Sequence, residues 1–247
     1  MPDKFNCKMC GYCCRNLGKV SFSDDEKKLL KQIKSDVNQI PLVIVYPEST
    51  DGILLFEWEY RILKRIAEER GIRVDFKINS VVFDLKSNKS LILDWFMDEK
   101  VCPFLKDEKC SVYAERAIEC KRYPLWIGTN TSDYGGKLMV EENYCANCNS
   151  SKEGIKGVKE RYGKLFSYAY QKHLNKEYIA LLVQSAIKKG VIKPALNYPM
   201  KFLLKRIEKS EKLSVFDFLI EKGLLTKEKY ENDVKKFKDG TYAQERL

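Results

Sequence analysis

The sequence is poor in histidine, in long apolar runs and in recognisable targeting segments. His173 is the only histidine in 247 residues and falls on a predicted helix far from the cysteines. Mixed Cys/His zinc fingers are therefore excluded, because one histidine without a partner group makes no site. The longest uncharged apolar stretch, Ile40 to Tyr46, is much shorter than the about 20 residues that cross a bilayer. Residues 1–7 lack the apolar core of a secretory signal, so we expect a cytoplasmic protein that does not bind membranes.

Several signatures of enzymes are missing as well. The chain shows no glycine-rich loop for S-adenosylmethionine and no nucleophile–base pair outside its cysteines. A bacterial ferredoxin run or a radical-SAM triad would need cysteine at position 17, which is Leu17. The carboxylate pairs Glu57/Glu59 and Glu68/Glu69 fall on a predicted helix, and we interpret them as exposed helix charges. The sequence therefore leaves catalytic residues unassigned.

Cysteine, in contrast, is abundant and clustered. The nine cysteines are Cys7, Cys10, Cys13, Cys14, Cys102, Cys110, Cys120, Cys145 and Cys148. Two residues between cysteines let the chain loop around one metal centre with both thiolates turned inward. Gly11 permits a close approach of the backbone to the ligand. In a reducing compartment such clustering indicates metal binding rather than disulfides, and ordinary buried cysteines show no preferred spacing.

The order of these cysteines resembles a known family. The chain reads Cys-x2-Cys-x2-Cys-Cys from residue 7, then Cys102-Pro103-Phe104-Leu105, Cys110-Ser111-Val112-Tyr113-x2-Arg116 and Cys120-x2-Tyr123-Pro124. This pattern is similar to the YkgJ-type CxxCxxCC family, described as zinc- or iron-chelating and often as iron–sulfur-cluster-containing proteins. It is more distantly similar to the cysteine domain of flagellin lysine N-methylase. The resemblance covers residues 5–20 and 100–148, and Arg116-Ala117 departs from the Arg-Pro common in the family.

The resemblance implies a set of metal ligands. They are Cys7, Cys10, Cys13, Cys14, Cys102, Cys110 and Cys120, with Cys145 as an eighth candidate and Cys148 as a further addition. The resemblance favours an iron–sulfur cofactor, for example a 4Fe-4S cluster, with zinc as the alternative. The spacing itself does not separate the two, because eight cysteines would fill two zinc sites, two clusters, or one cluster with cysteines to spare.

Basic residues stand beside most of the cysteines. They are Lys8, Arg15, Lys109, Arg116, Lys121 and Arg122. A four-thiolate site is net negative with either metal, so nearby cations are expected to stabilise it.

Charge divides the chain into two parts. Residues 1–149 hold 23 Lys and Arg against 23 Asp and Glu, whereas residues 150–247 hold 22 against 12 and carry the whole net charge of +10. All nine cysteines lie in the neutral part. We predict a metal-binding module over 1–149 and a basic helical domain over 150–247. The lysines of the second domain are expected mainly to face solvent, with weak nucleic-acid binding as a further possibility.

Local patterns predict the main elements. A capping box at Ser23 opens a helix to Asp36, and Ile40 to Tyr46 is a short strand. Another helix runs over 56–70, ended by Gly71. Alternation over 74–95 indicates a β-hairpin, followed by a helical piece near 112–119. From Glu153 the pattern is helical, broken at Gly190, Pro194, Pro199, Gly223 and Gly240, with buried faces over 178–183 and 216–220.

These observations favour an α+β protein. We expect a cysteine-rich, loop-dominated metal module with a small β-hairpin, followed by a basic, all-helical C-terminal domain. The favoured role is an iron–sulfur protein in redox or electron-transfer chemistry, with an unidentified redox or protein partner. Two alternatives stay open. One is a SAM-dependent protein lysine N-methylase-like enzyme, and the other is a zinc-stabilised module that binds partners or nucleic acid.

Overall fold

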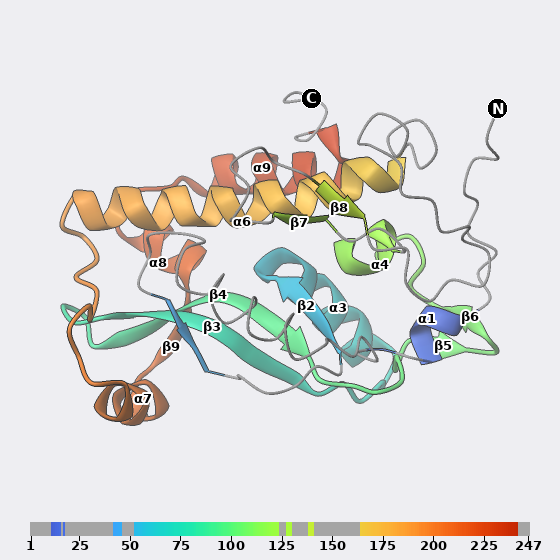
Figure 1. The fold of residues 1–247 in the computed structure, drawn as a ribbon, viewed down its shortest axis with the longest axis horizontal. Coiled ribbons are helices and arrows are strands. Elements are labelled where there is room, and N and C mark those ends of the chain that lie inside the picture. Colours follow the sequence, from blue (N-terminus) through green and yellow to red (C-terminus); the bar gives the residue numbers. More distant parts are fainter. Residues whose placement is uncertain are drawn as a thin grey trace.

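The computed structural model describes residues 11–15, 17, 42–45, 52–123, 127–129, 138–140 and 164–241. Helices and strands are mixed along them, as expected for an α+β protein (Figure 1). The helices are α1 Tyr12–Arg15, α3 Glu57–Glu69, α4 Ile118–Arg122, α6 Lys164–Lys188, α7 Met200–Lys209, α8 Val215–Glu221 and α9 Lys227–Asp239. The strands are β1 Val43–Ile44, β2 Ile53–Phe56, β3 Phe76–Asp84, β4 Lys89–Met97, β5 Leu105–Lys106, β6 Lys109–Cys110, β7 Ile127–Thr129, β8 Leu138–Val140 and β9 Lys212–Ser214.

A long antiparallel hairpin forms the centre of the main sheet. Strands β3 and β4 pair along their whole length, so the predicted hairpin is confirmed. Because side chains alternate across a strand, the facing pair Val82 and Leu91 enters one hydrophobic core. The neighbouring pair, Val81 and Ile92, enters the core on the opposite face. The hairpin therefore supports two separate layers of helices.

The sheet is completed from distant parts of the chain. Its strand order is β1-β3-β4-β2, and β9 also pairs with β4. Strand β2 pairs antiparallel with the end of β4 from Asp94 to Met97, whereas β9 pairs in parallel with residues 90–92. One edge of β4 is thus shared by a strand that precedes it and by one that follows it by more than a hundred residues. The expected all-helical C-terminal part contains this additional strand.

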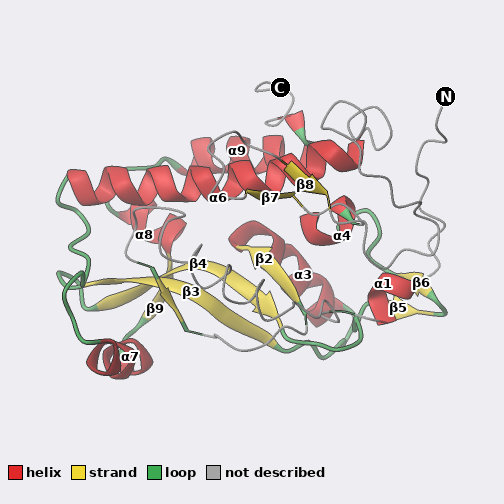
Figure 2. Ribbon diagram, viewed as in Figure 1, coloured by secondary structure: helices red, strands yellow, loops and turns green. Residues whose placement is uncertain are grey.

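Helices cover the two faces of the sheet unequally (Figure 2). Helices α3, α6, α8 and α9 lie on one side, and α7 lies on the other (Figure 1). Ile179 and Val183 of α6 and Phe218 and Leu219 of α8 are buried in the core that includes Leu91 of β4. The two buried helix faces predicted from the sequence are thereby confirmed. Described residues on both sides of residue 149 share one core, and the domain boundary itself falls outside the described residues and stays a prediction.

Several predicted helix ends agree with the structure. Helix α3 is followed by Gly71 at φ 63°, and α9 ends at Asp239 with Gly240 in the left-handed conformation at φ 72°. Glycine adopts this region without the steric cost that a Cβ imposes. The predicted strand over 40–46 is represented by β1, and the helix predicted from Ser23 lies outside the described residues.

The helix predicted near residues 112–119 is wrong. Residues 111–115 form turns, and α4 begins only at Ile118. Ser111 donates through its backbone N–H and its hydroxyl to the carbonyl oxygen of Phe104, at 2.9 and 2.8 Å. These two hydrogen bonds hold the segment to the preceding β5–β6 hairpin and replace the hydrogen bonds that a helix would make.

The longest described helix is α6, with 25 residues. Neither it nor any other helix in the described part of the chain combines the length and apolar character required to cross a membrane.

The shared core predicts that both parts of the chain unfold together. Leu219→Ala should lower the free energy of unfolding by about 2–5 kcal/mol, because Leu219 is fully buried. Leu181→Ala is the matched control, expected within about 0.5 kcal/mol of wild type, because Leu181 is exposed on α6. All three tryptophans precede residue 150, so fluorescence during urea denaturation reports on the first part. An unchanged fluorescence midpoint in Leu219→Ala, with an earlier loss of helical circular dichroism, would show two independent units.

Candidate metal centre

Five of the nine cysteines belong to the described residues, and they converge from three segments. They are Cys13 and Cys14 on α1, Cys102 and Cys110 near the β5–β6 hairpin, and Cys120 on α4. The thiol of Cys14 is hydrogen-bonded to those of Cys13 and Cys102, and Cys120 interacts electrostatically with Cys13, Cys14 and Cys110. All five are free thiols. Cys7, Cys10, Cys145 and Cys148 lie outside the described residues, and the ligand role of all nine stays a prediction.

The first segment is held by its backbone. Helix α1 follows Gly11, whose carbonyl oxygen accepts a bond from the Arg15 N–H at 3.0 Å. Gly11 has φ 69°, and a Cβ here would lie 2.9 Å from the carbonyl oxygen of Glu108. The close approach that the structure shows for Gly11 is to the turn of the β5–β6 hairpin, and the approach of its backbone to a ligand stays a prediction. The Arg15 side chain also pairs with the Glu108 carboxylate at 2.8 Å.

The second segment is joined directly to the first. The backbone N–H of Cys102 donates to the carbonyl oxygen of Cys14 at 2.7 Å. Leu105 and Cys110 then face each other across the β5–β6 hairpin. Its turn places Asp107 and Glu108 at positive φ, which suits a tight two-residue connection. The hairpin thereby returns Cys110 to the neighbourhood of Cys102.

The third segment depends on a buried carboxylate. Cys120 lies on α4, and the first N–H of this helix, that of Ile118, donates to Oε1 of Glu59 at 2.6 Å. The second oxygen, Oε2, accepts from the Phe56 N–H at 2.9 Å. A carboxylate at the amino end of a helix accepts a hydrogen bond from an unpaired N–H donor. Its negative charge also interacts favourably with the positive end of the helix dipole. Glu59 thus joins the start of α3 to the helix that carries Cys120.

The interpretation of Glu57 and Glu59 as exposed charges is wrong, because both are buried, at 3% and 2% exposure. Glu57 accepts from Arg61 at 2.8 Å and from the indole of Trp95 at 2.5 Å. Glu68 and Glu69 are exposed as expected. A signal for this difference exists in the sequence, since Glu59 is the third residue of a helix that follows an apolar strand, the position of a capping carboxylate.

Four of the cysteines belong to an apolar core cluster that also contains residues of α3. Cys102 is buried with Phe104, Val112 and Ala117, and Cys14, Cys110 and Cys120 pack against the same cluster. The pKa of Cys14 is raised to about 12 through its hydrogen bond to Cys102 and through burial. Burial likewise raises the pKa of Cys120. Crowded thiols in such surroundings keep their protons unless a cation compensates the thiolate charge.

The donor set fits a thiophilic metal, although the thiols do not yet surround one point. Within the described ranges, no three His, Cys, Asp or Glu side chains are arranged to hold a metal ion. The thiol of Cys14 is instead hydrogen-bonded to the thiols of Cys13 and Cys102. Thiols that interact in this way match the ligand preference of zinc and of iron–sulfur clusters for soft donors. Binding would require the side chains to lose their protons and turn to a common centre.

The predicted basic neighbours play unequal roles. Arg116 lies over the ring of Tyr113 at 3.9 Å, and its charge opposes the rise in the pKa of the Cys120 thiol. Arg15 is paired with Glu108, and Arg122 is paired with Glu119 on its own helix. Arg116 and Arg122 both interact electrostatically with Cys120 and can stabilise its thiolate, and Lys8 lies outside the described residues.

Removal of the Glu59 carboxylate should weaken both the fold and the site. Glu59→Ala leaves the N–H groups of Phe56 and Ile118 without an acceptor, at a cost of about 1–3 kcal/mol for each buried group. Glu68→Ala on the same helix is the control and should stay within about 0.5 kcal/mol of wild type. Urea denaturation gives the stability of each variant, and elemental analysis gives its metal content. Equal stabilities for the two variants would contradict this role.

The contribution of Glu59 should depend on pH. Burial raises the pKa of Glu59 from 4.5 to about 7, so the folded protein keeps a proton that the unfolded chain has released. This contribution is fully present below the unfolded pKa and is lost as the pH rises through 7. The stability of wild type relative to Glu59→Gln should therefore fall by up to about 3 kcal/mol between about pH 5 and about pH 8. Parallel pH profiles from urea denaturation would contradict the raised pKa.

Comparison with known proteins places the cysteine pattern in a family. A family model named CxxCxxCC, with the description "Putative zinc- or iron-chelating domain", matches residues 6–146. No curated protein and no solved structure shows significant similarity to the chain. The matched region includes all three cysteine segments brought together in the structure and spans more than half of the sequence. The protein therefore belongs to the CxxCxxCC family of metal-chelating domains.

Proposed function

We propose that the protein binds an iron–sulfur cluster and transfers electrons in redox chemistry. The observation that carries the proposal is the convergence of free cysteines from three segments: Cys14, Cys102, Cys110 and Cys120 share one apolar cluster, and Cys13 is hydrogen-bonded to Cys14. Thiolates held in this way are ligands for iron–sulfur clusters or for zinc. The description of the family names zinc and iron.

The adjacent pair Cys13 and Cys14 supports a centre with more than one metal atom. Ligand positions on different metal atoms relieve the crowding of two neighbouring side chains on one ion. The number of thiols does not choose the metal, because a structural zinc ion and an iron–sulfur cluster each take four cysteine ligands. An iron–sulfur cluster is the multinuclear centre that we propose, with Cys7 and Cys10 as further candidate ligands.

The surroundings of the thiols suit a carrier of electrons. When bound, an iron–sulfur cluster accepts and releases an electron at a potential set by burial, charge and hydrogen bonds. Phe104, Val112 and Ala117 exclude water from one side of the cysteines. Arg116 contributes a positive charge near Cys120, which favours the more negative, reduced state. The partner that exchanges the electron is a further protein or small redox carrier.

Metal analysis tests this proposal. The protein purified without oxygen should be brown, absorb broadly near about 400 nm, and contain iron and acid-labile sulfide. Reduction should bleach this absorption, and reoxidation should restore it. A colourless protein with stoichiometric zinc and no iron would falsify the proposal and would favour the zinc-stabilised module.

Substitution of a single cysteine should remove the metal and weaken the fold. Binding free energy at a structural site is folding free energy, on the order of 10 kcal/mol for zinc. Cys102→Ser should therefore lower both metal content and the midpoint of urea denaturation. Val101→Ala is the matched control, because Val101 is the exposed neighbour of Cys102, and it should retain both. If Cys102→Ser keeps its metal and its stability, the buried thiol is not part of the centre.

A further inference from the structure

The exposed apolar side chains of the described residues gather on and before α7. Five large hydrophobic side chains between residues 196 and 204 are exposed: Leu196, Tyr198, Met200, Phe202 and Leu204. Leu203 and Ile207 of the same helix are buried against the sheet in the core with Phe83. Helix α7 lies at the opposite end of the molecule from the cysteine segments α1, β5 and β6 (Figure 1). A function of this surface is therefore separate from the metal centre.

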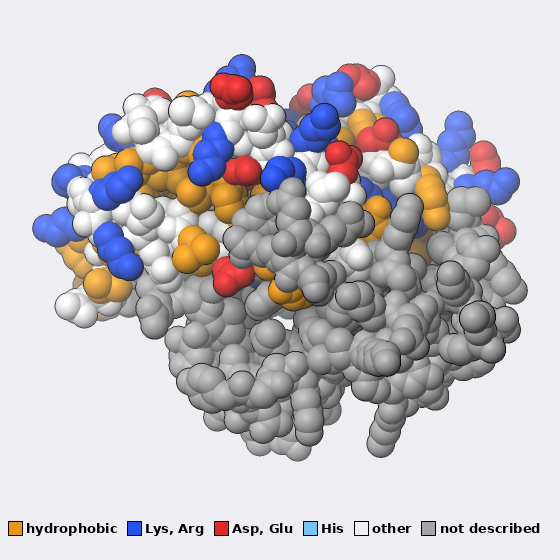
Figure 3. Space-filling view, turned by 90° about the horizontal axis from the view of Figure 1, so that it is seen from above, with side chains coloured by type: hydrophobic (Ala, Val, Ile, Leu, Met, Phe, Trp, Pro, Cys, Tyr) orange, Lys and Arg blue, Asp and Glu red, His pale blue; other side chains and the backbone are white. Residues whose placement is uncertain are grey.

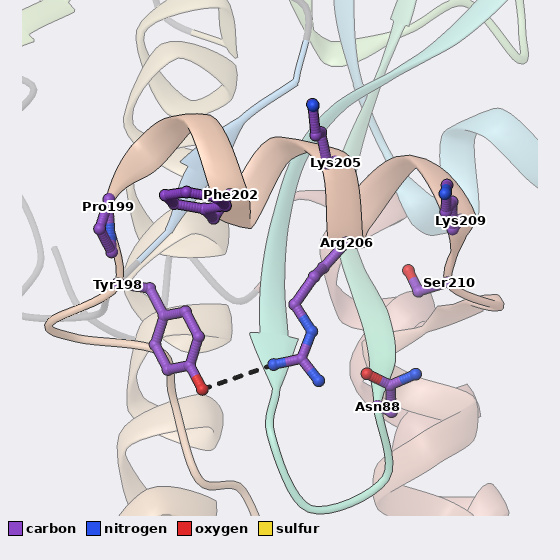
Figure 4. A pocket seen from close by; sticks show the side chains of 8 residues that line it. All are labelled: Asn88, Tyr198, Pro199, Phe202, Lys205, Arg206, Lys209 and Ser210. Carbon is purple, nitrogen blue, oxygen red and sulfur yellow. Dashed lines mark hydrogen bonds between the residues drawn. The ribbon is translucent and has the colours of Figure 1, made fainter.

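A surface pocket of about 700 Å³ lies along this helix. Its lining residues are Asn88, Tyr198, Pro199, Phe202, Lys205, Arg206, Lys209 and Ser210 (Figure 4). Three of the eight are cations, two are aromatic and none is acidic. Pockets of this volume commonly hold small ligands or segments of a larger one. The composition favours a ligand that carries negative charge and flat, stackable groups.

The cation nearest the aromatic wall is held in place. Arg206 extends from α7 toward Tyr198 and the hairpin turn at Asn88 (Figure 4). Its Nη1 donates to the Tyr198 hydroxyl at 3.5 Å, and the guanidinium lies 5.5 Å from the ring centroid of Phe83 and 5.7 Å from that of Tyr198. Contact with two rings restrains the side chain before any ligand arrives, which lowers the entropic cost of binding.

The remaining side chains complete a stacking and phosphate-binding surface. Phe202 is exposed on α7, and Lys205, Arg206 and Lys209 occur three, four and seven residues after it, on neighbouring turns of the same helix. The two carboxylates nearest in sequence, Glu208 and Glu211, do not line the pocket, and Glu211 pairs with Lys89 at 3.0 Å. Among the described residues that line the pocket, none carries a negative charge that would oppose an anion.

We propose that this pocket binds single-stranded nucleic acid. Bases stack on Phe202 and Tyr198, and Lys205, Arg206 and Lys209 contact the phosphates. Aromatic platforms bordered by cations are the means by which proteins bind single strands with little sequence preference. Asn88, exposed at the turn, supplies a donor and an acceptor for a base edge.

Net charge alone does not single out this surface. On the face seen in Figure 3, Lys and Arg side chains are interspersed with Asp, Glu and apolar side chains. The α7 pocket differs because it combines cations and aromatic rings without a lining carboxylate. A flat bilayer is the competing anionic surface, but the aromatic rings of Tyr198 and Phe202 line a concavity that fits a narrow, flexible chain better than a membrane.

The test uses the full chain and fluorescently labelled oligo(U) and oligo(dT), with binding followed by anisotropy at low and moderate salt. Phe202→Ala should weaken binding roughly tenfold, which is typical of the loss of one stacked base. Arg206→Gln should weaken it and reduce the slope of log K against log salt by about 0.7, the value for one phosphate contact on a single strand. Met200→Ala is the matched control, because Met200 is exposed on α7 outside the pocket, and it should bind as wild type does.

Three outcomes would overturn the proposal. They are no binding to either oligonucleotide, equal losses in Phe202→Ala and Met200→Ala, and binding to phosphatidylserine vesicles but not to oligonucleotides. Circular dichroism and metal content of each variant establish that the fold and the cysteine site are unchanged. Since the anisotropy readout does not depend on a bound metal, failure here leaves the proposed redox function in place, and a zinc-loaded protein that binds oligonucleotides supports only this inference.

Discussion

The buried carboxylate of Glu59 is the interaction on which the cysteine site depends. It accepts from the N–H of Phe56 at the end of β2 and from that of Ile118 at the start of α4. Without an acceptor, these two donors would be unsatisfied in an apolar interior, and α4 would lose the contact that fixes its position. Cys120 is carried by this helix, so the position of its thiol follows from a hydrogen bond to Glu59, a residue far from every cysteine in the sequence.

A second constraint is the double use of strand β4. One part of its edge pairs with β2, which leads directly into α3 beside the cysteine cluster. The other part pairs with β9, which leads into α8. The helices after residue 164 are thereby packed on the same sheet that supports the metal-chelating region. The basic C-terminal helices and the cysteine region are therefore connected through their shared pairing with β4, although we propose separate functions for them.

The two candidate sites differ in the charge of the ligand that each would bind. The thiols pack against an apolar core cluster, where the pKa of Cys14 is raised to about 12 and a bound cation would compensate the thiolates. The α7 pocket is open to solvent and gathers cations around exposed aromatic rings. One site is suited to a compact metal centre and the other to an extended anion, and the sheet separates them.

The sequence by itself determined the elements that depend on near neighbours. Alternation specified the β3–β4 hairpin, periodicity specified α3 and the buried faces of α6 and α8, and the cysteine spacing specified the family. Only the tertiary structure decided the late start of α4, the parallel pairing of β9, the burial of Glu57 and Glu59, and the meeting of Cys14, Cys102 and Cys120. Each of these depends on a partner many residues away, and local patterns carry no information about which distant donor, strand or thiol will be there.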